Sequence, residues 1–430
     1  MKIVRKKYLE MLENRMHNGL IKVVTGIRRC GKSYLLFNLF YEFLKQGNVS
    51  DDCIIKIALD DDVNEPLRNP ALLSEHIRSL VSDPQKNYYI LLDEIQFAIS
   101  DYEYKHPEEP IKIYSVLNGL LRLPNVDIYV TGSNSKFLSK DVLTEFRGRG
   151  DEIHVLPFSF SEYVQGYKGD VYHAWADYIM YGGLPLVLGM KTDEQKSSYL
   201  INLFAETYLK DIIARNKIEK TQELENLLDV LASSIGSLTN PTRVLQTFES
   251  VLHSKISINT LINYFDYLKD AFIISEADRY DVKGRRYIGS PKKYYFEDVG
   301  LRNARLHFRQ IEETHLMENV IYNELKFRGF NVDVGVVEKR EMDGREKQKR
   351  VQYEIDFVAT QGSRKYYIQS AFSLASEEKS EQEKKSLRSV NDSFKKIILV
   401  KDVIKPYHDN DGIAIIGLLD FLQNENSLEL

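Results

Sequence analysis

The sequence contains little cysteine. Its 430 residues include two, Cys30 and Cys53. Two cysteines provide neither a disulfide framework nor the ligand spacing of a metal site. Their scarcity fits a reducing compartment.

Long apolar segments are also missing. No stretch approaches the ~20 consecutive apolar residues of a membrane-spanning helix. The first residues, MKIVRKKYLEML, carry a charge in every helical turn and lack the apolar core of a secretion signal. We therefore expect a cytoplasmic protein with no membrane partner.

A surplus of basic residues is absent as well. Lys and Arg number 58 against 63 Asp and Glu, which gives a net charge of −5. Indiscriminate binding to polyanions is thereby excluded, and a nucleic acid would have to meet a local basic patch. The hydrophobic content of 43% is typical of a soluble globular chain, and its length predicts two to four domains.

A glycine-framed loop lies between two apolar segments. Gly26–Ser33, GIRRCGKS, matches the G-x-x-x-x-G-K-[ST] phosphate loop and follows the β-branched run Leu20–Thr25. Glycines let successive N–H groups point at phosphate oxygens, and the positive end of the following helix adds to the attraction. The alternative is an ordinary turn at a helix start. The expected nucleotide contacts are Gly26, Ile27, Arg28, Arg29, Cys30, Gly31, Lys32, Ser33 and Tyr34.

Two residues of this loop carry specific chemistry. Lys32 is expected to reach the β and γ phosphates, and the Ser33 hydroxyl to ligate Mg²⁺. Cys30 is most simply a small filler. The predicted cofactors are ATP and Mg²⁺.

An acidic strand end follows downstream. Asn87–Gln96, NYYILLDEIQ, is an apolar strand that ends in Asp93 and Glu94. Asp93 is expected to hold Mg²⁺ through water, and Glu94 to polarise the attacking water as general base. Alone, the pair would more simply be a solvent-facing strand end. Its position after a phosphate loop favours nucleotide binding.

Two further segments supply candidate catalytic residues. Val126–Ser135 ends in small polar residues, of which Asn134 or Ser133 would sense the γ-phosphate; ordinary turn chemistry is the alternative. Arg147 and Arg149 precede another strand, from which an arginine finger could reach a nucleotide on a neighbouring subunit. Solvated loop arginines are the simpler interpretation, and a finger would require a homo-oligomer.

Strand-like segments alternate with helical ones through this region. This pattern predicts a parallel sheet covered on both faces, and the additional strand favours the P-loop branch that uses a catalytic glutamate, here Glu94. The expected strands are Leu20–Thr25, Cys53–Leu59, Tyr88–Leu92, Val126–Thr131 and Glu152–Leu156.

The motifs TGIRRCGKS, LLDEIQ, TGSNSKFLS and FRGR with LPFSFSEY together resemble a large bacterial and archaeal group of AAA-type ATPases. The resemblance continues in YGGLPLVL, YLKDII and PKKYYFEDVGL and spans nearly the whole chain. It implies an additional-strand P-loop NTPase fold, ATP binding and hydrolysis, and a nuclease-like C-terminal domain of unknown function. The resemblance names no physiological substrate.

The middle of the chain reads as helical. Apolar residues recur at helical spacing from about residue 172 to 215, and Gly182, Gly183 and Pro185 interrupt them as a hinge or, more simply, a helix corner. Residues 222–295 predict three helices and a hairpin that turns at Lys283-Gly284, the order of a winged helix.

In a DNA-binding interpretation, the helix Thr260–Lys269 enters the major groove. Asn263, Asp266 and Asp270 on that helix oppose DNA electrostatically, so an internal docking or lid role is an equal alternative. The hairpin residues that would meet phosphates are Lys283, Arg285, Arg286, Lys292 and Lys293.

The last part, with its order of helix, three strands, helix and strand, resembles the PD-(D/E)xK nuclease core. The resemblance assigns Asp356 and Glu318 to metal-binding positions. Gln369-Ser370-Ala371 stands where an acid and a lysine belong, which predicts an inactive relative kept as a scaffold or binding surface. The plain alternative is that Glu354 and Asp356 flank a solvent-facing strand end.

We therefore expect four parts: an ATPase domain (1–165), a helical lid or linker (166–220), a winged helix (221–300) and a nuclease-like α+β domain (301–430). The leading hypothesis is an Mg²⁺-dependent ATPase that hydrolyses ATP to reposition its C-terminal modules. The alternative is a nucleotide-gated switch that binds DNA or a protein partner with negligible turnover. An ATP-driven nuclease is a third hypothesis, disfavoured by Gln369-Ser370-Ala371.

Overall fold

The computed structural model describes residues 3–100, 102–103, 106, 109–132, 148–284, 286–342, 348–374 and 376–429. The chain divides into two compact units. The first contains residues up to Pro157 together with Asp270–Phe272, and the second contains the remainder. Among the described residues, no helix is both long and apolar enough to cross a membrane.

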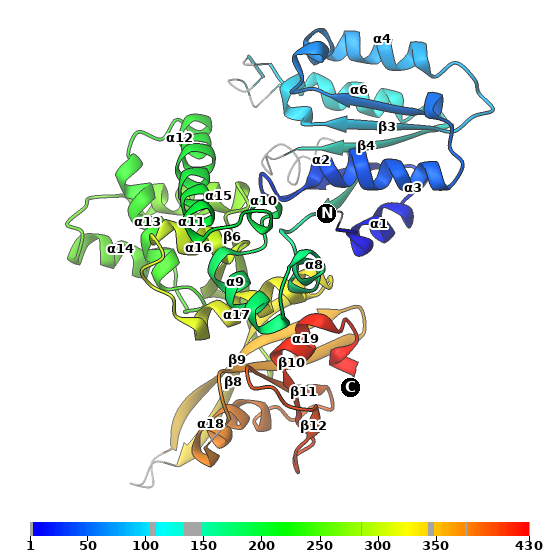
Figure 1. The fold of residues 1–430 in the computed structure, drawn as a ribbon. Helices are drawn as coiled ribbons and strands as arrows, with labels where there is room; N and C mark the ends of the chain where they lie inside the picture. The colour runs from blue at the N-terminus through cyan, green and yellow to red at the C-terminus, as the bar shows by residue number, and fades with distance from the viewer. Residues whose placement is uncertain are drawn as a thin grey trace. The chain divides into compact units, whose positions relative to one another are not determined.

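The first unit is built on a five-stranded parallel sheet (Figure 1). Its spatial order is β2-β3-β4-β1-β5, so β4 lies between β1 and β3. The predicted parallel α/β sheet is therefore confirmed. Because helices cover both faces, β1, β3 and β4 are buried at every position. The strands are β1 (Ile21–Thr25), β2 (Ile54–Ala58), β3 (Tyr88–Asp93), β4 (Val126–Thr131) and β5 (Gly150–His154).

Helices cover this sheet on both sides. Figure 1 shows α4 and α6 on one face and the α2–α3 helix on the other. Apolar residues of α4 and α6 recur at helical spacing, including Leu73 with Ile77 and Ile113 with Leu117, and pack into one core with the strands. The helices are α1 (Lys6–Glu13), α2 (Lys32–Tyr34), the π-helical η1 (Leu35–Phe40), α3 (Tyr41–Gln46), α4 (Pro70–Leu80) and α6 (Lys112–Leu120), with short 3₁₀ turns η2 (Asp51–Cys53), η3 (Asp62–Arg68) and η4 (Ile95–Ala98).

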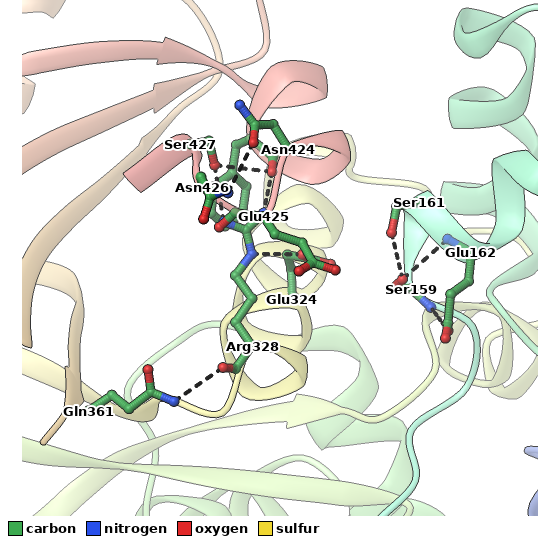
Figure 2. Close-up of polar contacts among 11 residues, drawn as sticks. Ser159, Ser161, Glu162, Glu324, Arg328, Gln361, Asn424, Glu425, Asn426 and Ser427 are labelled. Carbon is green, nitrogen blue, oxygen red and sulfur yellow. Dashed lines mark hydrogen bonds and ion pairs between the residues drawn. The ribbon is translucent and has the colours of Figure 1, made fainter. Parts of the chain in front are cut away.

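The second unit begins with helices. A capping box starts the first of them, because Ser159 accepts from the Glu162 N–H while the Glu162 carboxylate accepts from the Ser159 N–H (Figure 2). The helices are α8 (Phe160–Gly166), α9 (Val171–Tyr181), α10 (Pro185–Leu188), α11 (Asp193–Asn202), the π-helical η5 (Leu203–Leu209), α12 (Lys210–Asn216), α13 (Thr221–Ser233), α14 (Pro241–Ser250) and α15 (Ile258–Asp270).

The glycine interruption after α9 is a packed corner. Gly182 has a φ of 75°, and a Cβ added there would lie 2.2 Å from Asp298 Oδ1. The Asp298 carboxylate accepts from Gly183 N at 2.8 Å and from Leu301 N at 3.0 Å, which caps α16 (Val299–Arg305). Thus YGGLPLVL and PKKYYFEDVGL, far apart in sequence, meet at one buried carboxyl group.

The rest of the second unit is an eight-stranded mixed sheet. Its order is β12-β13-β11-β10-β9-β8-β6-β7. The predicted three helices and hairpin are present, but β6 also pairs in parallel with β8 at Arg279–Val334. The hairpin is thus an edge of the larger sheet, and the winged-helix and nuclease-like assignments stay predictions. The strands are β6 (Ile274–Asp281), β7 (Arg286–Phe296), β8 (Asn331–Met342), β9 (Gln348–Gln361), β10 (Arg364–Ala371), β11 (Lys395–Val400), β12 (Tyr407–His408) and β13 (Ala414–Gly417).

A buried arginine fastens the C-terminal segment to this sheet. Arg328 follows α17 (Glu313–Phe327), and its guanidinium donates to Glu324 Oε1 at 2.8 Å and to Ser427 Oγ at 3.0 Å (Figure 2). It also contacts the Phe421 carbonyl. The remaining elements are α18 (Glu377–Arg388), α19 (Leu418–Gln423) and η6 (Ser427–Glu429).

Candidate functional site

The loop after β1 has the backbone geometry that its glycines predict. Gly26 has a φ of 138°, and a Cβ there would lie 2.2 Å from the carbonyl oxygen of Val155, the residue after β5. Gly31, with φ 99°, precedes the first helical residue. Arg29 also has positive φ, at 66°. Left-handed residues beside right-handed ones turn successive N–H groups toward one side, which forms an anion-binding nest.

Lys32 begins the helix and lies against this loop. Its side chain is buried, at 4% exposure, and Nζ donates to the carbonyls of Gly26 at 2.9 Å and Ile27 at 3.0 Å. The ammonium group is therefore held beside the turn rather than in solvent. Cys30 is fully buried, as expected for a filler, whereas Arg29 and Tyr34 are exposed.

The two expected magnesium ligands are Ser33 and Asp93. Asp93 ends β3 and its side chain is 4% exposed, whereas Ser33 follows Lys32 and is exposed. Burial raises the pKa of the Asp93 carboxyl, against the opposing effect of hydrogen bonds from Thr131 and Ser33. A buried carboxyl whose ionised form is disfavoured gains from a nearby cation.

Thr131 was not identified from the sequence, yet it organises both acids. Its hydroxyl donates to Asp93 Oδ1 and accepts from the Glu94 N–H at 3.1 Å. Thr131 is the last residue of β4, the neighbour of β3, and is fully buried. The carboxyl ends of adjacent parallel strands meet at one edge of the sheet. Knowledge that β4 lies next to β3 would therefore have identified Thr131 as a neighbour of the two acids.

Glu94 takes a left-handed conformation, with φ 51° and ψ 53°. This conformation is uncommon for a residue with a side chain. Its carboxylate is half-buried and accepts a hydrogen bond from Gln96 Nε2. Backbone strain of this kind is concentrated at functional sites.

Of the remaining catalytic candidates, the structure describes only Arg149. Asn134, Ser133 and Arg147 lie outside the described residues. Arg149 is exposed, and its carbonyl accepts from Ile21 N at the start of β1. The phosphate loop follows the C-terminal end of β1, whereas Arg149 lies beside the N-terminal end of that strand. A finger role for Arg149 would therefore need the phosphate loop of a second copy of the chain.

Arg5, which the sequence analysis also did not identify, is hydrogen-bonded to the phosphate loop and to the segment after β5. It is 2% exposed and donates to the carbonyls of Cys30 at 3.0 Å and Leu156 at 2.8 Å. It also donates to the Pro157 carbonyl at 3.3 Å. An arginine near the start of the chain offers no sequence signal for this role, because its partners are backbone atoms.

Of the hairpin lysines, Lys283 is exposed as the DNA-binding interpretation requires, whereas Lys292 is half-buried and Lys293 is buried. Lys293 is 3% exposed and surrounded by carboxylates, so its predicted contact with phosphates is wrong. Lys292 is paired with Glu276 and Asp278, both at 2.8 Å. The side chains of Arg285 and Arg286 lie outside the described set. Among the described residues, no cluster of three or more His, Cys, Asp or Glu could hold a metal ion.

Family models match two segments of the chain. Residues 18–164 match the model described as an AAA domain, which contains the loop, both acids and Thr131. The described part of residues 18–164 thus has the parallel sheet and phosphate loop of an AAA-type P-loop domain. Residues 172–312 match a domain of unknown function, DUF8612, which contains the corner around Asp298 and the hairpin.

Relatives of similar length exist in bacteria and archaea. An uncharacterized protein of Haemophilus influenzae is 29% identical over 427 residues, 98% of each chain. The uncharacterized protein MJ1544 of Methanocaldococcus jannaschii is 26% identical over 399 residues, 89% of this chain and 81% of its own. The similarity therefore includes the parts that follow the AAA-type domain.

Solved structures resemble the chain only loosely. The Aeropyrum pernix ORC1 protein in complex with DNA gives a TM-score of 0.29 at 13% identity, covering 71% of this chain and 92% of its own. A DNA polymerase III gamma subunit-related protein of Thermotoga maritima gives 0.26 at 12% identity, covering 61% and 99%.

Proposed function

We propose that the AAA-type domain binds Mg²⁺-ATP and hydrolyses it. The observation that carries this proposal is the buried Lys32, whose Nζ is held by the carbonyls of Gly26 and Ile27 inside the glycine-framed loop. The Ser33 hydroxyl and the buried carboxyl group of Asp93 would supply the oxygen donors that Mg²⁺ shares with the β and γ phosphates.

In this proposal Lys32 is the phosphate clamp. An ammonium group has three N–H donors, and the carbonyls of Gly26 and Ile27 use two of them. The remaining donor would face a phosphate oxygen that lies in the turn. Residues 26–34 would contribute backbone N–H groups, and Ser33 and Asp93 would hold the metal ion, which neutralises charge on the phosphates.

Glu94 is the proposed general base. Asp93 and Glu94 are adjacent, and Thr131 fixes the backbone between them. A carboxylate placed next to a metal-binding acid can take a proton from the water that attacks the γ-phosphorus. Asn134 would orient that water, and Arg147 or Arg149 of a neighbouring copy would stabilise charge in the transition state.

The test is phosphate release by Glu94→Gln. The variant should bind Mg²⁺-ATP like the natural chain while its turnover falls by a factor on the order of 10² or more. Glu75→Gln, on the exposed face of α4, makes the same chemical change away from the site and should leave the rate unchanged. Equal rates for the natural chain and Glu94→Gln would exclude Glu94 as base.

A second candidate is a nucleotide-gated switch with negligible turnover. The hydrogen bond from Gln96 to Glu94 favours it, because a carboxylate engaged by an amide is a weaker acceptor for a water proton. Under this candidate the natural chain binds Mg²⁺-ATP but releases no phosphate above background, and a DNA or protein partner engages the second unit.

Repositioning of the second unit by hydrolysis is part of the leading proposal. The chain has one tryptophan, Trp175, and it lies on α9 in the second unit. Its Nε1 donates to Glu313 Oε1 at 3.1 Å. A change in Trp175 fluorescence on addition of Mg²⁺-ATP, lost in Lys32→Ala, would support repositioning, and an unchanged spectrum at saturating nucleotide would contradict it.

For the C-terminal part we propose a scaffold without nuclease activity. Gln369 and Ala371 lie on β10 where an acid and a lysine would be needed, and the N–H of Ser370 between them donates to Asp356 Oδ2 at 2.9 Å. Mg²⁺-loaded protein should leave mixed DNA and RNA intact. Cleavage that Asp356→Ala abolishes would overturn this assignment.

A further inference from the structure

A lysine lies at the centre of the carboxylate cluster in the second unit. Lys293 of β7 is 3% exposed at its side chain. Its Nζ lies 2.9 Å from Glu318 Oε1 on α17. The same Nζ lies 2.8 Å from Glu354 Oε1 and 3.3 Å from Asp356 Oδ1, both on β9. Three acids from two elements thus converge on one ammonium group.

The acids are held in place by other groups as well. Tyr295 donates its hydroxyl hydrogen to Glu318 Oε1 at 2.7 Å, and the Ser370 N–H fixes Asp356 from the neighbouring strand. A Cβ added at Gly236 would lie 3.1 Å from the Glu318 carboxyl group, so the chain after α13 closes over it. The carboxylates therefore surround the ammonium within a preformed shell.

The negative charges of the three carboxylates require a cation between them. Burial alone would lower the pKa of Lys293, but the three carboxylates raise it above its ordinary value. Burial raises the pKa of Glu318 to about 7, with Lys293 acting in the opposite direction. Without a cation, the buried carboxylates of Glu318 and Asp356 would face one another beside the more exposed Glu354, which is unfavourable in a site with little access to water.

We propose that Lys293 is a tethered cation, occupying the position that a divalent metal ion would take among Glu318, Glu354 and Asp356. Several oxygen atoms of carboxylates around one point form the ligand set of a hard divalent cation. Here the distances of 2.8–3.3 Å are those of N–H···O bonds rather than metal bonds. The cluster is thereby closed to metal ions, and it joins β7, α17 and β9.

This inference is independent of the proposed ATPase activity, and it makes a positive prediction. Replacing Lys293 by Met removes the charge and leaves an unbranched side chain that is one atom shorter, without the terminal nitrogen. The three acids are then left around a space of ammonium size, and the variant should gain a site for Mn²⁺ or Mg²⁺ that the natural chain lacks.

The experiment is equilibrium dialysis of the full chain with Mn²⁺, without nucleotide. Lys293→Met should bind about one more Mn²⁺ per chain than the natural protein, because a hard cation with carboxylate ligands replaces the ammonium. Lys292→Met, at the neighbouring lysine paired with Glu276 and Asp278, is the matched control and should gain none. Adding Asp356→Asn to Lys293→Met should remove the gain.

Two results would overturn the proposal. One is Mn²⁺ binding by the natural chain that Asp356→Asn abolishes, which would make the cluster a metal site with Lys293 as an accessory. The other is a folded Lys293→Met variant that binds no more Mn²⁺ than the natural chain.

The proposal can still be tested if Lys293→Met is less stable than the natural chain. A ligand that binds only the folded state raises the unfolding temperature. Mn²⁺ should therefore raise the melting temperature of Lys293→Met, measured by circular dichroism, and leave that of the natural chain unchanged. If Mn²⁺ has no effect on the variant, the proposal is wrong.

Discussion

The hydroxyl group of Thr131 is hydrogen-bonded to the buried carboxyl group of Asp93 at the edge of the N-terminal sheet. The two residues end neighbouring parallel strands, β4 and β3, and the same hydroxyl accepts from the N–H of Glu94. One side chain thus fixes the orientation of the proposed metal ligand and of the proposed base. In the proposed function the two acids act as a pair because the neighbouring strand β4 holds both of them.

Thr131→Val tests this relationship. Valine keeps the volume and removes both hydrogen bonds, so the acids lose their shared support at a cost of about 1–3 kcal/mol. We expect at least a tenfold fall in phosphate release, accompanied by a lower melting temperature. Thr247→Val, on α14 of the second unit, should leave the rate unchanged. An unaltered rate in Thr131→Val would contradict the assigned role.

Gly26→Ala tests the loop. A Cβ at Gly26 collides with the Val155 carbonyl oxygen at 2.2 Å, so the loop must move. We expect ATP affinity to fall by more than tenfold. Gly19→Ala is the matched control, since Gly19 also has positive φ, at 74°, but has nothing within 4 Å of an added Cβ. It should cost about 1 kcal/mol in stability and leave ATP affinity intact.

Arg5→Met tests the support beneath the loop. The change leaves the carbonyls of Cys30 and Leu156 buried without their charged donor, which destabilises the first unit by about 1–3 kcal/mol per lost partner. We expect weaker ATP binding and a lower melting temperature. Arg78→Met, at a more exposed arginine of α4, should change neither. Normal affinity in Arg5→Met would show that the loop holds its shape alone.

Asp298→Asn tests the corner of the second unit through pH. Burial raises the pKa of Asp298 to about 6 in the folded chain, against hydrogen bonds from the N–H groups of Gly183 and Leu301. Its ordinary value is 3.8, so between these values the folded state keeps a proton that the unfolded state releases. The stability due to this group is present below pH 4 and is lost as pH rises through 6.

The natural chain should therefore gain unfolding free energy relative to Asp298→Asn as pH falls from 7 to 4, by an amount on the order of 3 kcal/mol. Urea unfolding followed by the fluorescence of Trp175, which lies on α9 next to the corner, measures it. The raised pKa of Glu318 is common to both proteins and cancels in the difference. A difference that does not vary with pH would contradict the assignment.

The sequence correctly predicted the features of the fold that depend on local residue patterns. Strands β1 to β4 follow from short apolar runs, and the phosphate loop follows from the spacing of Gly26, Gly31 and Lys32. The polar strand β5 (Gly150–His154) begins and ends two residues before the predicted Glu152–Leu156. Periodicity alone could not find Thr131 or Arg5. The first acts through the order of strands in the sheet, and the second acts on backbone carbonyls far along the chain.

Sequence periodicity also could not predict the surroundings of the β6–β7 hairpin. Alternation and basic charge predicted a solvent-facing ribbon over residues 277–296, and the strands do form. Whether a lysine on such a ribbon faces water depends on which element packs against it. Pairing of β6 with β8 brings α17 and β9 next to Lys293, and those elements carry its carboxylates.

The central claim is that the loop gathers Mg²⁺-ATP beside Asp93. Its most direct test is equilibrium dialysis of ATP against the natural chain and Lys32→Ala, with Mg²⁺ and with a chelator. We predict one bound ATP per chain, an affinity that falls when Mg²⁺ is removed, and at least a hundredfold weaker binding by Lys32→Ala. Failure of the natural chain to retain ATP in the presence of Mg²⁺ would contradict the account.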